Sequence, residues 1–310
     1  MSQKSDIQLM AELATEYFLQ GHSKVEIATA HGISRFQVAR LLERAQNEGI
    51  VQIRVVNPLD AGEDHADLAA RLGVSSATVV TPRTGETLRS ALARQAAGVL
   101  QQRLHEGARL GVAWSRTLMH LPEHLQALPR VDVVQLVGPL SAPGTSAAAS
   151  SGLVHALGSL AGGQIWPLPT PLIVESDAVA ASLRAMAEVR AALEAADDLD
   201  VAVVSVGGGG EGASTLRARF TPQEQQDAVE AGVVAECSGI LVTANGEIAR
   251  SGMENRVIGV RAEQLRSARV IALAPAQDHP EAVIAAARAG FVDDLVLSDD
   301  LALRVKAALD

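Results

Sequence analysis

The stretch from Gly111 to Thr117 (GVAWSRT) gathers residue types that bind small anions. It runs from an expected strand into an expected helix, so the two hydroxyl side chains would stand beside the backbone N–H groups of the helix start. Such N–H groups and hydroxyls hold phosphate or carboxylate oxygens. A capped helix start without any ligand is an equally simple interpretation. The residues of this stretch that we assign to a ligand site are Gly111, Trp114, Ser115, Arg116 and Thr117.

Two further loops follow expected strands and could complete such a site. Gln135 and Gly138 stand at the end of one strand, and Gly207 and Gly208 open a run of four glycines after another. Glycines let a backbone approach a ligand closely, although a glycine run is also simply a flexible loop. The run is not a dinucleotide-binding fingerprint, because no acidic residue ends a neighbouring strand ~20 residues further on.

The sequence holds no pattern typical of a catalytic or metal centre. The lysines are Lys4, Lys24 and Lys306, so residues 25–305 contain none that could form a Schiff base. The single cysteine, Cys237, excludes a disulfide framework and a CxxC metal site, and it fits a small buried hydrophobe. The eight histidines show no metal-ligand spacing, and there is no G-x-S-x-G nucleophile elbow. We therefore expect neither a metal nor a cofactor.

The N-terminal part of the chain has the spacing of a helix-turn-helix. Apolar residues from Met10 to Phe18 recur at i, i+3, i+4 and i+7, which predicts an amphipathic helix ending near Gly21. Ser23 would cap a second helix, and Gly32 would take the left-handed conformation that a tight turn requires. Ser34 would cap a third helix, with a glutamine three residues later completing an S-x-x-Q capping box. Two helices joined by a short glycine-containing turn predict a DNA-binding unit.

The third helix would present a polar face to the bases of the major groove. Arg40 could fork onto guanine, Gln37 could pair with adenine, and Phe36 could touch a thymine methyl. Gln37 could equally be only the partner in the capping box, and Arg44 is better suited to a phosphate contact than to a base. Phe36 points away from the apolar stripe of its helix, which favours an interface. The residues that we assign to double-stranded operator DNA are Ser34, Arg35, Phe36, Gln37, Arg40 and Arg44.

A wing and a linker are expected after these helices. Residues 50–56 alternate enough for a strand behind the third helix, and residues 57–64, rich in turn formers and acids, are typical of a linker. We therefore predict two domains. Residues 1–58 would bind DNA, and residues 59–310 would bind an effector and form the oligomer.

The net charge divides along the same boundary. The chain has 26 basic and 36 acidic residues, and residues 1–58 hold six of each, so the whole negative excess lies in the body. A head of zero net charge can still bind phosphates when its arginines cluster on one helix, because the local electrostatic potential, not the net charge, determines phosphate binding. With only 2% aromatic residues, stacking on single-stranded nucleic acid is excluded as a main binding mode. No membrane-spanning apolar run and no signal peptide occur, so we expect a soluble, cytoplasmic protein.

In the body, short β-branched runs alternate with helical stretches. Apolar runs such as VDVVQLV, DVAVVSV and RVIALA indicate a parallel sheet covered on both faces. We therefore predict a doubly wound α/β domain with its ligand at the carboxyl ends of the strands. The expected helices include residues 64–72 and 86–104, and the expected strands span residues 77–81, 108–113, 131–137, 200–206, 239–243, 270–274 and 295–297.

Together these motifs resemble the SorC family of bacterial transcriptional regulators, which is grouped with the DeoR-like sugar regulators. The head matches the family pattern at EIA, residues 26–28, and at GIS-R-x-x-V-x-R-L-L, which opens residues 32–51. The body is similar to the family's effector domain, which is related to phosphosugar isomerases. The matching stretches of the body are residues 111–118, 134–138, 169–171, 203–208, 254–259 and 270–309.

The resemblance implies a homodimer or homotetramer that binds operator DNA with an affinity switched by a phosphorylated sugar. On this basis Ser115 and Thr117 would hold the phosphate, and Gln135, Asn255 and Arg256 would line the sugar site.

Two departures from the family pattern concern the effector. Glu236, at the position of the family's ligand-contacting acid, lies in Ala-Glu-Cys rather than in a Gly-Asp-hydrophobic pattern. Residues 274–279 (APAQDH) replace an Ala-Gly-Gly-x-x-Lys pattern, and His279 could stand in for the missing lysine only when protonated. The effector is therefore expected to be a sugar phosphate or an unphosphorylated sugar or polyol.

Two other functions stay open beside that of a non-enzymatic regulator. The chain could be a phosphosugar isomerase or deaminase with an appended head, for which Glu236 and His279 are the candidate base and acid. It could also be a DNA-binding oligomer whose ligand site has decayed.

Overall fold

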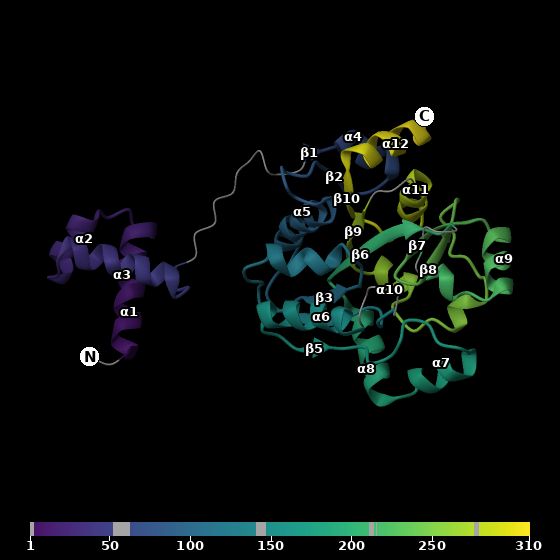
Figure 1. Cartoon of the computed structure of the whole chain (residues 1–310), viewed down its shortest axis with the longest axis horizontal. Coiled ribbons are helices and arrows are strands. Elements are labelled where there is room, and N and C mark those ends of the chain that lie inside the picture. The colour runs from purple at the N-terminus through teal and green to yellow at the C-terminus, as the bar shows by residue number, and fades with distance from the viewer. Residues whose placement is uncertain (1–2, 52–62, 141–146, 211–213, 215, 276–278) are drawn as a thin grey trace. The chain divides into compact units, whose positions relative to one another are not determined.

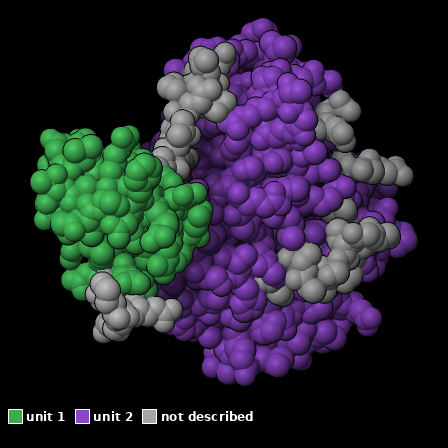
Figure 2. Space-filling model, turned by 60° about the vertical axis from the view of Figure 1, so that its left-hand side comes forward, with its two compact units in different colours: residues 1–60 green, residues 61–310 purple. Residues whose placement is uncertain are grey.

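The computed structural model divides into two compact units, residues 1–60 and residues 61–310, which Figure 2 shows in different colours. The structure describes residues 3–51, 63–140, 147–210, 214, 216–275 and 279–310. Each unit has a hydrophobic core of its own.

Residues 3–51, the described part of the N-terminal unit, fold into helices (Figure 1). Helix α1 (Gln3–Ala14) runs into a π-helical turn (Thr15–Leu19), and α2 (Lys24–His31) and α3 (Arg35–Asn47) follow. The predicted helix therefore ends near Gly21 as expected, and its last turn is π-helical, because the Gln20 N–H donates to the carbonyl five residues back. The buried apolar residues that pack together are Leu13, Ala14, Ile27, Ala28, Val38 and Leu42.

Capping boxes begin both helices of the helix-turn-helix. Ser23 Oγ accepts from the Glu26 N–H, and the Glu26 carboxylate accepts from the Ser23 N–H at 2.8 Å. Ser34 and Gln37 form the same reciprocal pair, with 2.8 Å between Ser34 N and Gln37 Oε1. Gly32 ends α2 in the left-handed conformation at φ 64°. The predicted helix starts and the turn between them are therefore confirmed.

The region between the two units was predicted to hold a wing and a linker. Most of both segments lies outside the described residues. Glu63 and Asp64, predicted as linker and helix start, instead form the short strand β1, which pairs antiparallel with β2. The helix that was expected to begin at Asp64 begins at Ala66.

The larger unit is built on a sheet with the strand order β1-β2-β10-β9-β6-β3-β4-β5. Every neighbouring pair on this path is parallel except β1 with β2. The predicted doubly wound parallel sheet is therefore confirmed. The strands are β1 (Glu63–Asp64), β2 (Ser76–Val80), β3 (Arg109–Val112), β4 (Asp132–Gln135), β5 (Ile165–Trp166), β6 (Val201–Gly208), β7 (Val233–Cys237), β8 (Ile240–Thr243), β9 (Arg269–Ala274) and β10 (Asp294–Ser298).

Helical segments connect these strands (Figure 1). Helix α5 packs across β2, β10, β9 and β6, whereas α8 packs on β4 and β5. The α-helices of the larger unit are α4 (Ala66–Leu72), α5 (Leu88–Arg103), α6 (Ala147–Ala161), α7 (Asp177–Arg184), α8 (Ala187–Ala195), α9 (Pro222–Glu230), α10 (Ala262–Arg266), α11 (Pro280–Arg288) and α12 (Asp299–Leu309). The 3₁₀ segments are η3 (Leu118–His124), η4 (Ala196–Asp198), η5 (Arg217–Arg219) and η6 (Met253–Asn255).

The direction of winding reverses between β3 and β6. From β3 the chain proceeds outward through β4 to β5, and from β6 it proceeds the other way through β9 to β10. Because β3 and β6 are hydrogen-bonded neighbours, the loops at their carboxyl ends diverge. Ligands of doubly wound folds bind at such a switch point.

Three local predictions for the body were wrong. Residues 239–243 were expected in the parallel sheet, but β8 forms an antiparallel hairpin with β7, because Ser238 and Gly239 both take positive φ values and close a tight turn. Gly207 and Gly208 were expected in a loop, but they extend β6, because β7 supplies them with a partner strand. The helix expected after residue 117 is a 3₁₀ segment that contains a proline.

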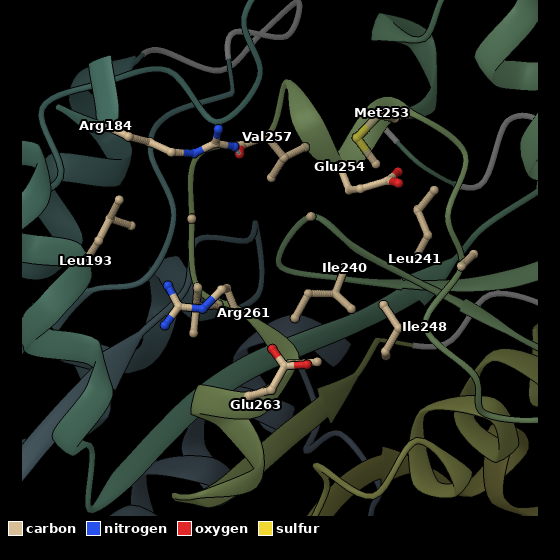
Figure 3. A pocket seen from close by; sticks show the side chains of 15 residues that line it. Arg184, Leu193, Ile240, Leu241, Ile248, Met253, Glu254, Val257, Arg261 and Glu263 are labelled. Carbon is tan, nitrogen blue, oxygen red and sulfur yellow. Dashed lines mark hydrogen bonds between the residues drawn. The ribbon is translucent and has the colours of Figure 1, made fainter. Parts of the chain in front are cut away.

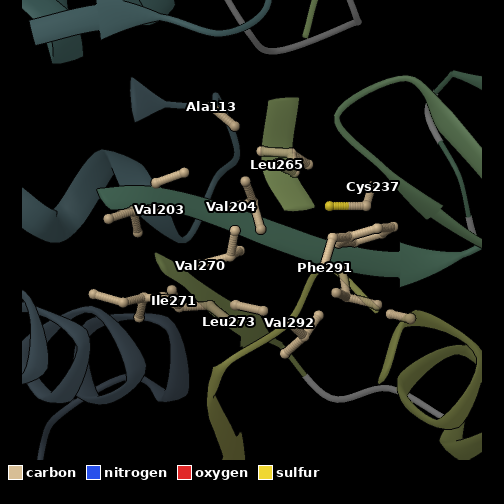
Figure 4. Packing of buried hydrophobic residues seen from close by; sticks show 14 of the residues in the cluster. Ala113, Val203, Val204, Cys237, Leu265, Val270, Ile271, Leu273, Phe291 and Val292 are labelled. Carbon is tan, nitrogen blue, oxygen red and sulfur yellow. The ribbon is translucent and has the colours of Figure 1, made fainter. Parts of the chain in front are cut away.

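The central strands carry the core of the larger unit (Figure 4). Val203 and Val204 of β6, Val270 and Ile271 of β9 and the neighbouring Phe291 are at most 1% exposed. Burial of each such side chain stabilises the fold by about 1.5–3 kcal/mol. β6, on one side of the switch point, and its neighbour β9 are thus anchored by packing.

A buried carboxylate, Asp294, stands at the start of β10. It accepts hydrogen bonds from Arg269 Nε at 2.8 Å, from Arg103 Nη2 at 2.9 Å and from Ser76 Oγ at 2.6 Å. Burial alone would raise the pKa of Asp294, but these hydrogen bonds hold it well below its usual range. The network therefore joins α5 to three strands at their amino ends.

Candidate functional site

The loop after β3 leaves the sheet at the switch point with free hydrogen-bond donors. The Ala113 N–H still pairs with Val203 of β6, but the next four backbone N–H groups, from Trp114 to Thr117, donate to no group in the described part of the chain. Ser115 Oγ accepts from the Leu118 N–H at 3.1 Å. Thr117 is 1% exposed. Consecutive unpaired N–H groups beside hydroxyls form a concavity suited to an anion.

A free cation stands on the same loop. Arg116 is exposed and forms neither an ion pair nor a hydrogen bond with the residues that the structure describes. An anion bound by the N–H groups of this loop would therefore have a guanidinium available beside it.

The end of β6 faces this loop across the switch point. Gly207 and Gly208 pair with Glu236 and Ala235 of β7. The carbonyl of Gly209, the next residue, accepts from Arg217 Nη1 at 2.9 Å. A Cβ on Gly209 would lie 2.8 Å from a Val233 methyl, so glycine permits this close backbone approach.

Arg217 is a candidate site residue that our sequence reasoning missed. Arg217 lies in no recognisable sequence motif. Its guanidinium is located near the end of β6 by its hydrogen bond to the Gly209 carbonyl.

Glu236 brings an acid to the same end of β6. Its Oε1 accepts from the Gly239 N–H at 2.7 Å. Burial raises the pKa of this carboxyl, and the hydrogen bond from Gly239 opposes the rise. The neighbouring Cys237 is buried, and burial together with the Glu236 charge raises the pKa of its thiol to about 12. The thiol is therefore a packing group, as the sequence predicted.

Three predicted site residues shape strand ends. Gln135 is 4% exposed, and its amide donates to the Val137 carbonyl and accepts from the Leu168 N–H. A Cβ on Gly138 would lie 1.7 Å from the Thr170 carbonyl oxygen, and one on Gly111 would lie 2.8 Å from a Leu136 methyl. These residues support the site by allowing close packing.

Arg256 is fully engaged within the fold. Its Nε and Nη2 fork onto the two carboxylate oxygens of Glu224 at 2.8 and 2.6 Å, and Nη1 donates to the Val174 carbonyl. Burial alone would raise the pKa of Glu224, but the Arg256 and Thr221 hydrogen bonds lower it. Arg256 thus links α9 to its neighbours, and its expected role as a sugar contact stays a prediction.

The last two predicted effector residues lie at the surface. Asn255 is exposed at the end of η6, and its carbonyl accepts from Arg184. His279, just before α11, is partly exposed and lies 3.2 Å from a carboxylate oxygen of Glu281. The 114–117 loop and the end of β6 lie at the carboxyl ends of neighbouring strands, and Glu236 pairs with Gly207 where β6 continues past β3. Gln135, Arg256 and His279 already have protein partners.

Helix α3 exposes the predicted DNA-binding residues. Phe36 is 87% exposed, and Arg35 and Arg40 are exposed without a partner among the described residues. Gln37 is the capping-box partner, so its carbonyl oxygen is occupied. Arg44 pairs with Glu48 on its own helix, which favours the phosphate or solvent role over base reading.

Two features are absent from the described part of the chain. Within these ranges, no group of three or more potential ligands is placed to hold a metal ion. None of the described helices has the length and apolarity required to span a membrane.

Known proteins are similar to this chain both over its body and along nearly its whole length. Residues 58–305 match a family model described as a putative sugar-binding domain. The chain is 26% identical over 266 residues to the deoxyribonucleoside regulator of Bacillus subtilis, and the alignment covers 84% of each chain. It is 23% identical over 313 residues to the sorbitol operon regulator of Klebsiella pneumoniae, with 97% of this chain and 98% of the relative covered. The solved structure of full-length SorC from Klebsiella pneumoniae superposes with a TM-score of 0.70 at 21% identity, covering 99% of this chain and 100% of that chain.

The family match spans most of the chain, and the relatives align along nearly all of the remainder. The fold agrees with that of the solved relative. The chain therefore belongs to the SorC family of transcriptional regulators with a sugar-binding domain.

Proposed function

We propose that α3 binds operator DNA and that a carbohydrate effector, bound at the β3–β6 switch point, controls this binding. The observation that carries the effector site is the row of N–H groups from Trp114 to Thr117, which, like the Arg116 side chain beside it, have no partner in the described part of the chain. Relatives named for sorbitol and deoxyribonucleosides support a carbohydrate-type effector.

The DNA-binding surface combines one apolar and two cationic side chains. Phe36 is too exposed to belong to the core, and Arg35 and Arg40 are unpaired in the described part of the chain. Arginine forks onto guanine or phosphate, and phenylalanine can contact a thymine methyl. We assign base reading to Arg40 and Phe36, and phosphate contact to Arg35 and Arg44.

The effector site fits an anion without the family's lysine. The N–H row, Arg116 and Arg217 supply donors and positive charge, and Glu236 can accept from a sugar hydroxyl. A sugar phosphate is therefore the effector class that this site favours, with an unphosphorylated sugar or polyol as the alternative.

Control follows from differential affinity. We propose a homodimer or homotetramer whose conformations place the α3 helices at different spacings, so that an effector that prefers one conformation changes operator affinity. A coupling of about 1–3 kcal/mol would change that affinity five- to 150-fold.

The enzymatic alternative is less well supported. The candidate base Glu236 accepts from the Gly239 N–H, and the candidate acid His279 faces Glu281. The two side chains therefore contact other groups rather than each other. The relatives are named as transcriptional regulators. We therefore propose a non-enzymatic protein.

A thermal-shift screen of the full chain tests the effector site. Each sugar or polyol is compared with its phosphate at matched ionic strength. A ligand at 100 times its Kd adds about 2.7 kcal/mol to the free energy of unfolding, which shifts the Tm by several degrees. We expect Thr117→Val to abolish the shift and Thr29→Val, which removes a similar hydroxyl from α2, to preserve it.

Because Thr117 is buried, the exposed Arg116→Gln serves as a second variant. An unchanged response in both site variants would remove this loop from the site. A shift with unphosphorylated ligands alone would contradict the phosphate assignment.

A further inference from the structure

The larger unit contains a cavity that the loop after β3 does not line. It is a cavity of about 390 Å³ between α7, α8, the β7–β8 hairpin and residues 253–263. None of the predicted effector residues lines it. Figure 3 shows it from close by.

The cavity wall is mainly apolar. Ile240, Leu241, Met253 and Val260 are each at most 8% exposed, so the lining is rigid core rather than mobile surface. A largely apolar cavity of 300–1,000 Å³ with a few fixed polar groups is the usual form of a small-molecule site.

Arg184 supplies the fixed polar group. It lies in the last turn of α7, and its Nη2 donates to the Asn255 and Val257 carbonyls, which hold the guanidinium plane at the cavity wall (Figure 3). It is partly buried, and no acidic side chain of the described residues pairs with it. Its Nε and Nη1 donate to no group in the same ranges.

The other charged lining residues are less suited to anchor a ligand. Arg261 is paired with Asp197 at 2.9 Å, and Glu263 lies 3.9 Å from Arg266. Glu254 is exposed and accepts from the Ser251 N–H. Arg184 is therefore the partly buried cation of the lining, and Glu254 is an exposed carboxylate that no cation of the described residues pairs with.

We propose that this cavity binds a small amphipathic anion, a carboxylate or sulfonate with an apolar body, and that Arg184 holds the anionic group. The apolar body occupies the space between Ile240, Leu241 and Met253. A guanidinium with free donors in a poorly hydrated wall binds an anion more strongly than one in water. The lining of this cavity includes none of the predicted effector residues, and the proposal does not rest on the proposed carbohydrate site.

The test uses 1-anilinonaphthalene-8-sulfonate, which has an aromatic body and a sulfonate, with the full chain. We expect saturable fluorescence enhancement with one probe per chain, displaced by octanoate but not by octanol at the same concentration. Arg184→Gln should weaken probe binding about tenfold or more, whereas Arg190→Gln, on the exposed surface of α8, should not change it.

A second variant covers the possibility that loss of Arg184 disturbs the fold. Ile248 is a partly exposed lining residue, and Ile248→Phe fills the cavity while leaving Arg184 in place, so it should also abolish probe binding at unchanged Tm. Equal binding by wild-type and Arg184→Gln protein, or displacement by octanol, would overturn the proposal. Light scattering compares the oligomeric state of the folded variants with that of the wild type. A change would overturn the proposal too, because it would indicate that a second copy of the chain, rather than a small anion, covers the cavity.

Discussion

Disruption of the Arg256–Glu224 pair distinguishes a structural link from a ligand contact. Both side chains are 12% exposed, and the fork joins α9 to the chain around Val174 through charge-assisted hydrogen bonds. Removal of one partner of a buried pair costs about 3–5 kcal/mol. Because some exposure remains, we expect about 3 kcal/mol for Arg256→Gln, which lowers the Tm of a unit of this size by about 6–12 °C.

The assay is urea and thermal unfolding followed by tryptophan fluorescence. The two tryptophans, Trp114 and Trp166, both lie in the larger unit and report its unfolding. Glu224→Gln should cost a similar amount, and the double variant should cost less than the sum of the two single variants. Arg190→Gln removes an exposed pair on α8 and should cost at most about 0.5 kcal/mol.

The same pair predicts a pH dependence. Although burial opposes it, hydrogen bonding lowers the pKa of Glu224 in the fold. Its stabilising contribution is therefore fully present above the unfolded pKa of about 4.3 and is lost as the pH falls below it. The reasoning would be refuted if Arg256→Gln left unfolding unchanged while weakening the effector response, since Arg256 would then be a ligand contact.

Three further predictions concern other parts of the chain. Asp294→Asn should cost about 3 kcal/mol at neutral pH and progressively less below about pH 4, because the pKa of this carboxyl is depressed in the fold; urea titrations at both pH values measure the difference. Arg40→Ala should weaken operator binding by about 1–3 kcal/mol and relax base preference at one position, measured by selection from random duplexes; uniform weakening across sequences would indicate a phosphate contact. Gly138→Ala should destabilise by about 3 kcal/mol or prevent folding, because its Cβ would meet a backbone carbonyl at 1.7 Å; wild-type denaturant stability would contradict this packing.

Local features could be predicted from the sequence because their partners are close along the chain. The S-x-x-E and S-x-x-Q boxes join residues three apart, and both form as expected around Ser23 and Ser34. Apolar runs likewise predicted most parallel strands. The π-helical end of the first helix carries no comparable signal, because its amphipathic spacing is compatible with a continuous α-helix.

Long-range pairing explains what the sequence could not predict. Gly207 and Gly208 are strand residues only because β7, about 30 residues later, supplies hydrogen bonds. From the sequence Arg256 is a candidate ligand contact. In the structure α9 places Glu224 beside it, and the two side chains form an ion pair. The strand order that puts β3 next to β6 likewise arises from packing of whole elements.

The proposed carbohydrate site and the proposed anion cavity share structural elements. Glu236, at the end of β6, accepts from the backbone of Gly239, which lines the cavity, and the segment from Met253 to Val257 holds the carbonyls that orient Arg184. A ligand that shifts either element changes the free energy of both sites. By linkage, the factor by which one ligand alters the affinity of the other is the same in both directions. An anion in the cavity would thus bias the carbohydrate response without touching the carbohydrate.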